Sequence, residues 1–395
     1  MKVLVIGSGG REHALVQTFW RQGHEVYSCP GNPGIWGLAP PLGVAVDDYG
    51  QLVEAVKKKG IDLTVVGPEV HLERGIQNVF EKEGLKLFGP SREAAHLETS
   101  KAFAKEFMAR HKIPTARFEI GSDLETAKRF LEEGGVVVKA SGLAGGKGVT
   151  CCKTFEEAKR AIREIGSGEI VIEELLEGPE LSLQCIVDGE RIVPLLAARD
   201  HKRLYDGDAG PNTGGMGAFA PLPLDKEILQ RVVEPTLAGL KADGIAYRGI
   251  LYFGLMLTKE GPKLLEYNCR FGDPEAQAVL PLLESDLAKL MMGPLPKTPL
   301  RWSKKASICV VLAAKGYPTS PIQGASIRKM RGRDDLFFFH AGTKLEGDKL
   351  VTAGGRVIGV TALGTNLEDA RQSAYAAIDA LQTPWAHFRR DIGRD

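Results

Sequence analysis

The sequence has no apolar run long enough to cross a bilayer, and it has no cysteine pair spaced as C-x-x-C. The first absence argues against a membrane-spanning segment, and the second argues against common cysteine-based metal and redox motifs. Residues 1–7 are expected to form a buried strand, because their apolar run is too short for a secretory signal. The six cysteines, at positions 29, 151, 152, 185, 269 and 309, are therefore expected to be reduced, buried thiols of a cytoplasmic protein.

The chain also lacks an excess of charge of either sign. Its 51 basic and 50 acidic residues give a formal net charge of +1, which offers no match for nucleic acid or for a membrane surface. A length of 395 residues with 43% hydrophobic and 26% charged residues is typical of a soluble globular protein with several domains. The 47 glycines indicate many tight turns and close approaches of backbone to ligand.

Residues 1–99 alternate strand and helix patterns, which predicts a doubly wound parallel sheet covered on both faces. Functional loops are expected at the carboxyl ends of the strands, over 7–11, 30–34 and 67–69. The predicted strands are 3–6, 25–28, 63–66 and 85–88, and the predicted helices lie near 12–22, 49–59 and 71–83.

The rest of the chain predicts two further units. A helix over 101–111, capped by Thr99 or Ser100, precedes a smaller alternating unit at about 115–185 with strands at 136–140, 149–152, 170–174 and 181–187. Segment 199–217 is too rich in turn residues for regular structure, long strands follow at 249–257 and 263–269, and residues 293–299 form a linker. We predict an α/β chain with domains at 1–99, 100–292 and 293–395, ending in a helix near 367–381, with a mobile small lobe at about 115–185.

The most informative segment is 264–275 (LLEYNCRFGDPE). Glu266 and Asn268 are two residues apart on a predicted strand, so both side chains point to one face. A carboxylate and an amide oxygen are hard ligands, suited to Mg²⁺ that is also held by substrate phosphates. Arg270, Asp273 and Glu275 then place three charges around a turn, which indicates the metal end of a nucleotide site.

Two glycine-rich loops follow strands. Residues 7–13 (GSGGREH) could capture phosphate through backbone N–H groups, although Glu12 occupies the third glycine position of a dinucleotide fingerprint. No acidic residue for an NAD ribose follows the second strand, so hydride transfer is disfavoured, and a turn needed for packing alone is the alternative.

Residues 138–148 (VKASGLAGGKG) depart from a P-loop at Ser141 and Gly148. Lys139 precedes the loop on its strand, unlike the lysine of a protein kinase. The favoured interpretation is a strand lysine with a flap that closes over a triphosphate; a glycine-rich hairpin with a surface lysine is the alternative.

Two polar segments complete the set. Residues 173–180 (EELLEGPE) could offer backbone groups to an adenine edge and a carboxylate to ribose, although acidic runs are more often a solvated face. Residues 199–217 form a charged, glycine-rich loop, and such loops are either disordered or functional.

Taken together, these motifs resemble the phosphoribosylamine–glycine ligase family of the ATP-grasp superfamily over essentially the whole chain. The most specific pieces are residues 268–275 (NCRFGDPE), 200–203 (DHKR) and 210–218 (GPNTGGMGA), supported by 31–34 (GNPG), 67–69 (GPE) and 352–356 (TAGGR). The resemblance implies two lobes that clamp ATP between sheets, preceded by the parallel-sheet domain and followed by a small mixed α/β domain.

The resemblance also implies roles for individual residues. Lys101 and Lys139 would contact the phosphates, Glu180 the ribose, and Glu266 and Asn268 would bind Mg²⁺ or Mn²⁺. The flap and the adenine pocket would be formed by Gly145, Gly146, Lys147, Gly148, Glu173, Glu174, Leu175 and Leu176. The expected substrate-binding residues are Gly9, Gly10, Arg11, Asn32, Pro68, Glu69, Asp200, Lys202, Arg203, Asn212, Thr213, Gly214, Gly215, Met216, Gly217, Arg270 and Asp273.

The implied reaction joins glycine to 5-phosphoribosylamine with ATP, giving glycinamide ribonucleotide, ADP and phosphate through a glycyl phosphate. Lys139, Arg270 and Asp273 are the candidate catalytic residues, because phosphoryl transfer needs positioning and charge neutralisation more than a nucleophile. The chain is expected to be a monomer or a weak homo-oligomer. Two alternatives are another ATP-grasp ligase or carboxylase, and a nucleotide-binding protein without catalysis.

Overall fold

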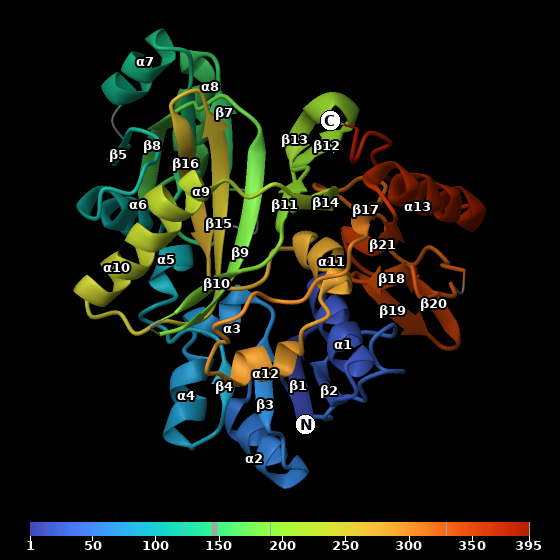
Figure 1. Cartoon of the computed structure of the whole chain (residues 1–395). Coiled ribbons are helices and arrows are strands. Elements are labelled where there is room, and N and C mark those ends of the chain that lie inside the picture. Colours follow the sequence, from blue (N-terminus) through green and yellow to red (C-terminus); the bar gives the residue numbers. More distant parts are fainter. Residues whose placement is uncertain (123, 144–147, 190, 329, 395) are drawn as a thin grey trace.

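The computed structural model describes residues 1–122, 124–143, 148–189, 191–328 and 330–394, and its first unit is a parallel sheet (Figure 1). The strands lie in the order β2-β1-β3-β4 and all run parallel, as predicted. β1 and β3 are buried along nearly their whole length, which explains their continuous apolar runs. The strands are β1 (Lys2–Gly7), β2 (Glu25–Pro30), β3 (Leu63–Val66) and β4 (Leu87–Phe88).

The helices of this unit begin and end at residues suited to the task. Asp48 caps α2 by accepting the Gln51 N–H, and Gly60 ends it with a left-handed φ of 64°. The single helix predicted near 71–83 is wrong, because left-handed Gly75 separates two short helices. The helices are α1 (Gly10–Arg21), α2 (Tyr49–Lys59), α3 (Glu69–Glu73) and α4 (Ile76–Lys82).

A small antiparallel sheet follows, in the order β5-β8-β6-β7, with two helices packed on its apolar face. Two helices precede it, α5 (His96–Thr99) and α6 (Lys101–Arg110), and Ser100 caps α6 by accepting the Phe103 N–H. Thr154 and Glu157 form a capping box at the start of α8. The elements of this lobe are β5 (Phe118–Ile120), α7 (Leu124–Glu132), β6 (Val136–Ala140), β7 (Val149–Cys152), α8 (Phe155–Ile165) and β8 (Ile170–Glu174).

The largest element is a ten-stranded sheet. Eight strands follow the order β16-β15-β9-β11-β14-β17-β21-β18, while β10 pairs with β9 and β22 pairs with β17. It runs from the middle of the chain into the C-terminal part, so the predicted boundary at 292 and 293 is crossed by one continuous sheet. Its strands are β9 (Glu180–Asp188), β10 (Ile192–Pro194), β11 (Ala197–Asp200), β14 (Gly217–Leu222), β15 (Arg248–Thr258), β16 (Gly261–Asn268), β17 (Ala306–Ala314), β18 (Leu336–His340), β21 (Arg356–Gly364) and β22 (Ala386–His387).

Two predictions about this region are wrong. The strand predicted at 181–187 belongs to the large sheet between β15 and β11, and not to the small lobe, because its backbone pairs with β15 along its whole length. Segment 199–217 is not irregular: it contains the hairpin of β12 (Arg203–Tyr205) and β13 (Ala209–Asn212), joined by the turn η1 (Asp206–Asp208).

Short helices link the long strands. The longer helix α13 (Leu367–Leu381) matches the predicted final helix and packs on β17 and β21. The described residues 293–299 contain neither helix nor strand, in agreement with the predicted linker. Within the described ranges, each helix is too short or too polar to cross a membrane. The remaining elements are α9 (Lys226–Ile228), η2 (Leu229–Val233), α10 (Glu234–Ala242), α11 (Glu275–Val279), η3 (Leu280–Leu282), α12 (Leu287–Met292), β19 (Thr343–Glu346) and β20 (Lys349–Thr352).

Candidate active site

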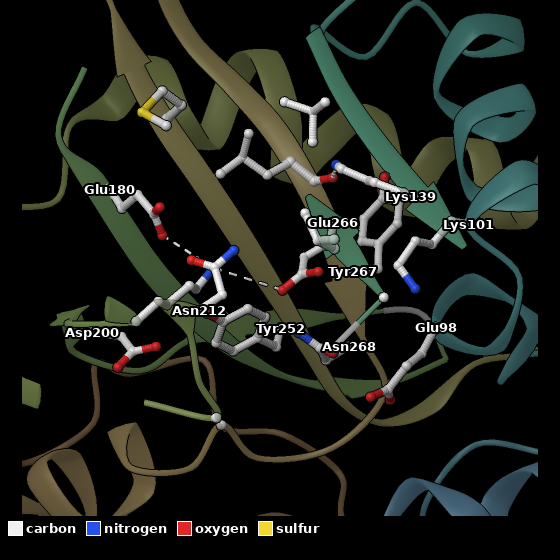
Figure 2. A pocket seen from close by; sticks show the side chains of 18 of the residues that line it. Glu98, Lys101, Lys139, Glu180, Asp200, Asn212, Tyr252, Glu266, Tyr267 and Asn268 are labelled. Carbon is white, nitrogen blue, oxygen red and sulfur yellow. Dashed lines mark hydrogen bonds and ion pairs between the residues drawn. The ribbon is translucent and has the colours of Figure 1, made fainter. Parts of the chain in front are cut away.

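A cavity of about 760 Å³ lies between the small sheet, α6 and the strands β15 and β16, and it extends to the loops of the parallel sheet (Figure 2). Most residues predicted for the site line this cavity, although their positions in the chain span more than half of its length. They are Arg11, Glu69, Lys101, Lys139, Gly148, Glu173, Glu174, Leu175, Leu176, Glu180, Asp200, Lys202, Arg203, Asn212, Thr213, Gly214, Glu266, Asn268, Arg270 and Asp273. The predicted Gly145, Gly146 and Lys147 lie outside the described residues.

Glu266 and Asn268 both reach the cavity from β16, as their spacing predicts, and Tyr267 between them is 2% exposed (Figure 2). The Glu266 carboxylate lies 3.8 Å from the Lys202 ammonium group. Burial favours the protonated form of Glu266, but the positive charges of Lys202, Lys139 and Lys101 outweigh it and lower its pKa. Glu266 is therefore a carboxylate at neutral pH, which a metal ligand must be.

The donor set fits a hard divalent cation. One carboxylate and one amide oxygen leave most coordination positions to water and to phosphate oxygens, the usual arrangement for Mg²⁺ with a nucleotide. Among the described residues, no group of three or more His, Cys, Asp or Glu side chains is placed to hold a metal by itself. The pair thus suits a cation delivered with its phosphates better than a cation held by protein alone.

Lysines surround the space next to this pair. Lys139 on β6 donates to the Leu265 carbonyl at 3.3 Å, and Lys101 at the start of α6 donates to the Gly142 carbonyl at 3.2 Å. Glu173 is shared between two lysines, with its oxygens 2.9 Å from Lys139 and 3.1 Å from Lys105. Burial lowers the pKa of Lys105 to about 8, even though Glu173 opposes the shift. This end of the cavity can neutralise several phosphate charges.

The segment after β8 forms the wall beside the lysines. The Glu173 side chain points to the lysines, so only the backbone groups of this residue remain for a nucleotide base. Glu174 accepts from Arg117, and the Leu175 N–H is bonded to the Gly135 carbonyl. Gly178, with φ of 149°, needs to be glycine, because a Cβ there would lie 2.3 Å from the Leu257 oxygen. Leu175, Leu176 and Pro179 also line the cavity, so this wall offers it apolar groups.

Asp200 contributes a buried carboxyl to the cavity from the end of β11. Burial and the nearby Glu275 raise its pKa well above the ordinary value. Its Oδ1 atom is buried and has no hydrogen-bond partner in the protein. The neighbouring Gly215 lies behind it, where a Cβ would be 2.7 Å from that oxygen and 2.5 Å from Pro274.

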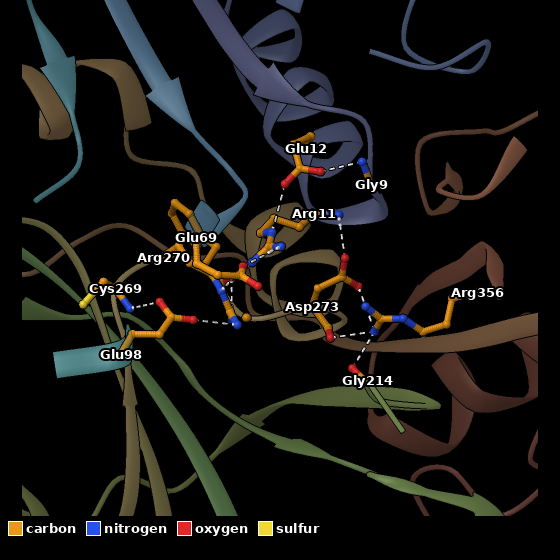
Figure 3. A network of polar contacts seen from close by, with 12 residues as sticks. Gly9, Arg11, Glu12, Glu69, Glu98, Gly214, Cys269, Arg270, Asp273 and Arg356 are labelled. Atoms are coloured by element: carbon orange, nitrogen blue, oxygen red, sulfur yellow. Dashed lines mark hydrogen bonds and ion pairs between the residues drawn. The ribbon is translucent and has the colours of Figure 1, made fainter. Parts of the chain in front are cut away.

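The end of the cavity nearest the parallel sheet is a network of guanidinium and carboxylate groups (Figure 3). Arg270 pairs with Glu69 at 3.2 Å and with Glu98 at 2.9 Å. Asp273 pairs with Arg356 at 3.2 Å, and Arg356 also donates to the Gly214 carbonyl at 2.6 Å. Burial opposes ionisation of Asp273, but Arg356 and Arg11 lower its pKa.

The first glycine loop does not present an open row of N–H groups. The Gly9 N–H donates to the carboxylate of Glu12 at 2.5 Å, and a Cβ on Gly10 would meet Gln277. Of this loop, Arg11 is the predicted residue that reaches the cavity, where its guanidinium donates to the Phe271 carbonyl at 2.7 Å. Glu12 occupies the position in which a phosphate was expected.

Seven predicted site residues do not line the cavity. Asn32 donates to the Ser8 and His340 carbonyls, and Met216 is completely buried. The prediction that all cysteines are buried is wrong for Cys151, which is exposed and lines the cavity. All six cysteines lie in the described part of the chain and are free thiols. The seven residues are Gly9, Gly10, Asn32, Pro68, Gly215, Met216 and Gly217.

Sequence reasoning missed several cavity residues with clear partners, among them Glu98, Lys105, Tyr252 and Arg356. Lys105 had a signal, because it lies four residues after Lys101 on one helix and so shares its face. Tyr252 pairs directly with Asn268 across β15 and β16, and predicting this contact would have required the register of the two strands. Arg356 ends the 352–356 motif that supports the family resemblance, but that motif gives no site role, and Glu98 has no local signal.

Comparisons with known proteins agree over the whole length. Residues 1–98, 99–276 and 307–395 match the N, ATP-grasp (A) and C domains of the family described as phosphoribosylglycinamide synthetase. A phosphoribosylamine–glycine ligase of Caldanaerobacter subterraneus subsp. tengcongensis is 46% identical, covering 99% of each chain.

Solved structures give the same result. The crystal structure of phosphoribosylamine–glycine ligase from Thermotoga maritima is similar with a TM-score of 0.86 and 35% identity, covering 99% of this chain and 100% of the other. Biotin carboxylase from Campylobacter jejuni shares the fold, with a TM-score of 0.74 and 18% identity over 98% of this chain and 91% of that one. The chain belongs to the phosphoribosylglycinamide synthetase family, whose curated members are named phosphoribosylamine–glycine ligase.

Proposed function

We propose that this protein is a phosphoribosylamine–glycine ligase of purine biosynthesis. It joins glycine to 5-phosphoribosylamine and converts ATP to ADP and phosphate. The observation that carries the proposal is one cavity with lysines around a carboxylate–amide pair at one end and an arginine–carboxylate network at the other. Family membership over the full chain supports the same reaction.

The first step is attack of the glycine carboxylate on the γ-phosphorus of ATP, which gives glycyl phosphate and ADP. Lys139 and Lys101 neutralise the charge that spreads over the phosphoryl oxygens. Glu266 and Asn268 would hold Mg²⁺ or Mn²⁺, which when bound adds further positive charge at the phosphates. Glu174, Leu175 and Leu176 form the adenine wall, and Glu180 lies at the ribose.

In the second step the amine of phosphoribosylamine attacks the activated carbonyl, and phosphate leaves. Arg270, Asp273 and the 212–214 segment hold glycine, whereas Arg11 and Glu69 face the sugar phosphate and its ring. Asp200, which also lines the cavity, binds a polar group of a substrate. The walls of the cavity keep water from the acyl phosphate.

The proposed cellular location is the cytoplasm, and the proposed assembly is a monomer or weak homo-oligomer that binds neither nucleic acid nor membranes. The proposed domains are 1–99, 100–292 and 293–395. Sedimentation of the purified chain at several concentrations tests the assembly state. A stable dimer at nanomolar concentration would contradict it.

The decisive experiment is release of ADP from Mg-ATP, with glycine and freshly made phosphoribosylamine added separately and together. Turnover that requires both is the expected result. Release with glycine alone would retain the acyl phosphate and remove the proposed acceptor. Binding of ATP without release under any condition would favour a nucleotide-binding protein without catalysis.

Arg11→Ala tests the sugar-phosphate end. The variant is expected to raise the KM for phosphoribosylamine by about tenfold or more, as expected when a charged partner is lost, with a smaller change in the KM for ATP. An unchanged KM for phosphoribosylamine would remove Arg11 from this role.

A further inference from the structure

The hairpin of β12 and β13 carries cavity residues but has little structure of its own. Its strands pair at two positions with an irregular register between them, and residues 205–211 are exposed to solvent. A two-stranded ladder this short is marginal by itself. Yet Lys202, Arg203, Asp208 and Asn212, on or next to this hairpin, line the cavity. Contacts from elsewhere in the chain must therefore fix its position.

Leu204 packs against Met216 and Ala313 at the base of the hairpin, and further contacts, which reach its turn, come from the C-terminal segment 387–391. The His387 ring is 2.9 Å from the Leu204 carbonyl oxygen. The Arg390 N–H donates to Asp206 at 2.7 Å, and the Gly207 N–H donates to Asp391 at 2.8 Å. Segment 387–391 thus contacts both β12 and the turn of the hairpin.

Arg389 is the centre of this set, and its side chain is 2% exposed. One guanidinium nitrogen lies 2.6 Å from the Asp208 carboxylate and 3.2 Å from the Arg203 carbonyl oxygen. The other two nitrogens form a two-point contact with Asp391, at 2.7 and 2.6 Å. A guanidinium held at both edges has a fixed orientation.

We infer that Arg389 is a positioning residue for catalysis: it holds the β12–β13 hairpin against the C-terminal segment and so fixes Lys202, Arg203 and Asn212 over the cavity. Lys202 shows what depends on that position, because its ammonium group is 3.1 Å from Glu180 and 3.8 Å from Glu266. Displacement of catalytic groups by about 1 Å can lower turnover by about a hundredfold. The kinetic part of this inference rests on the proposed ligase function.

The test compares Arg389→Ala, Arg389→Lys and Asp208→Asn with the full-length wild-type chain. Asp208→Asn removes the negative charge from the same contact and so weakens it, and because the Asp208 side chain is 71% exposed the variant keeps the test valid if Arg389→Ala fails to fold. Arg389→Ala is expected to raise the KM for glycine and lower kcat by about tenfold to a hundredfold. Arg389→Lys is expected to recover part of this loss.

Hydrogen exchange gives a readout that a uniform loss of stability would not produce. Amides of the 203–212 hairpin are expected to exchange faster in Arg389→Ala and Asp208→Asn, while β15 and β16 keep wild-type rates. Arg390→Ala is the matched control, since its side chain is 58% exposed and pairs with Asp379, away from the hairpin.

Wild-type kinetics and wild-type hairpin exchange in both Arg389→Ala and Asp208→Asn would overturn the inference. Equal loss of affinity for every substrate, with exchange raised throughout the chain, would also overturn it by showing a general stability role. A wild-type chain without ligase activity would contradict the proposed function, and the exchange data would still test the contact.

Discussion

The two ends of the cavity differ in their positively charged side chains. At the nucleotide end the positive groups are lysines, and Glu173 is shared between Lys105 and Lys139. At the other end they are arginines, and Arg270 bridges Glu69 and Glu98 (Figure 3). An ammonium group is a compact charge on a flexible stem, whereas a guanidinium is a planar fork with fixed directions.

The difference suggests a division of labour. Lysines can turn from a protein carbonyl to a phosphate oxygen as charge moves during transfer, and Lys139 donates to such a carbonyl at a long 3.3 Å. The arginine end is held together by contacts between segments far apart in the chain: the Arg270 guanidinium donates to Glu69, and the Cys269 N–H donates to Glu98. In the proposed mechanism the lysine end, where the phosphates would bind, can therefore adapt, whereas the arginine end, where the other substrates would bind, has a fixed geometry.

The largest expected effect compares Glu173→Gln with Glu98→Gln. Glu173→Gln leaves two buried ammonium groups without a carboxylate, which is expected to lower the free energy of unfolding by about 3–5 kcal/mol. Glu98→Gln is expected to lower it by about 1.5 kcal/mol, because Arg270 keeps Glu69. Burial also raises the pKa of Glu98, so a neutral side chain is better tolerated there. Denaturant unfolding at pH 7 measures both, and equal losses would contradict the difference between the ends.

A second comparison separates activity from stability. Glu266→Gln is expected to lower kcat/KM by about a hundredfold or more, because even changes outside the metal ligands lower metal affinity by up to about that amount. Its stability should change little, since the Glu266 side chain is one-third exposed. Steady-state ADP release at several Mg²⁺ concentrations measures the effect. Glu260→Gln, in the turn before β16 and 77% exposed, is the matched control and should retain wild-type rates.

The last expected effect is acid sensitivity outside the cavity, where α1 packs against β18. Burial lowers the pKa of His13 to about 3, and its Nδ1 accepts the His340 N–H at 2.8 Å. The unfolded chain binds a proton at this residue near pH 6.5, while the folded chain does so only near pH 3. Stability from His13 is therefore present above pH 6.5 and is lost as the pH falls.

From pH 7 to pH 5 this loss is about 2 kcal/mol. His13→Asn keeps an acceptor for the His340 N–H but removes the titrating ring, so its unfolding free energy should fall by about 2 kcal/mol less over the same range. Urea unfolding at the two pH values provides the measurement. The same pH dependence in both proteins would show that His13 is protonated in the folded state.

Local sequence patterns predicted several of the residues that line the lysine end of the cavity. The two-residue spacing of Glu266 and Asn268 predicted a shared face, and Lys139 before a glycine loop predicted a cavity lysine. The first glycine loop shows the limit of such patterns, because the carboxylate of Glu12 bonds the Gly9 N–H that a phosphate was expected to use. A loop motif states which donors exist, but not which internal acceptor they find.

The sequence by itself determined the parallel sheet, the long strands β15 and β16, the metal-type pair and the family resemblance, since each depends on periodicity or on adjacent residues. Tertiary structure alone decided which sheet β9 joins, that Glu98 and Arg356 meet the loop at 270–273, and that residues 387–391 hold the β12–β13 hairpin. These outcomes depend on pairing between distant segments. Such pairing is selected by the free energy of the whole fold, and no local sequence pattern marks it.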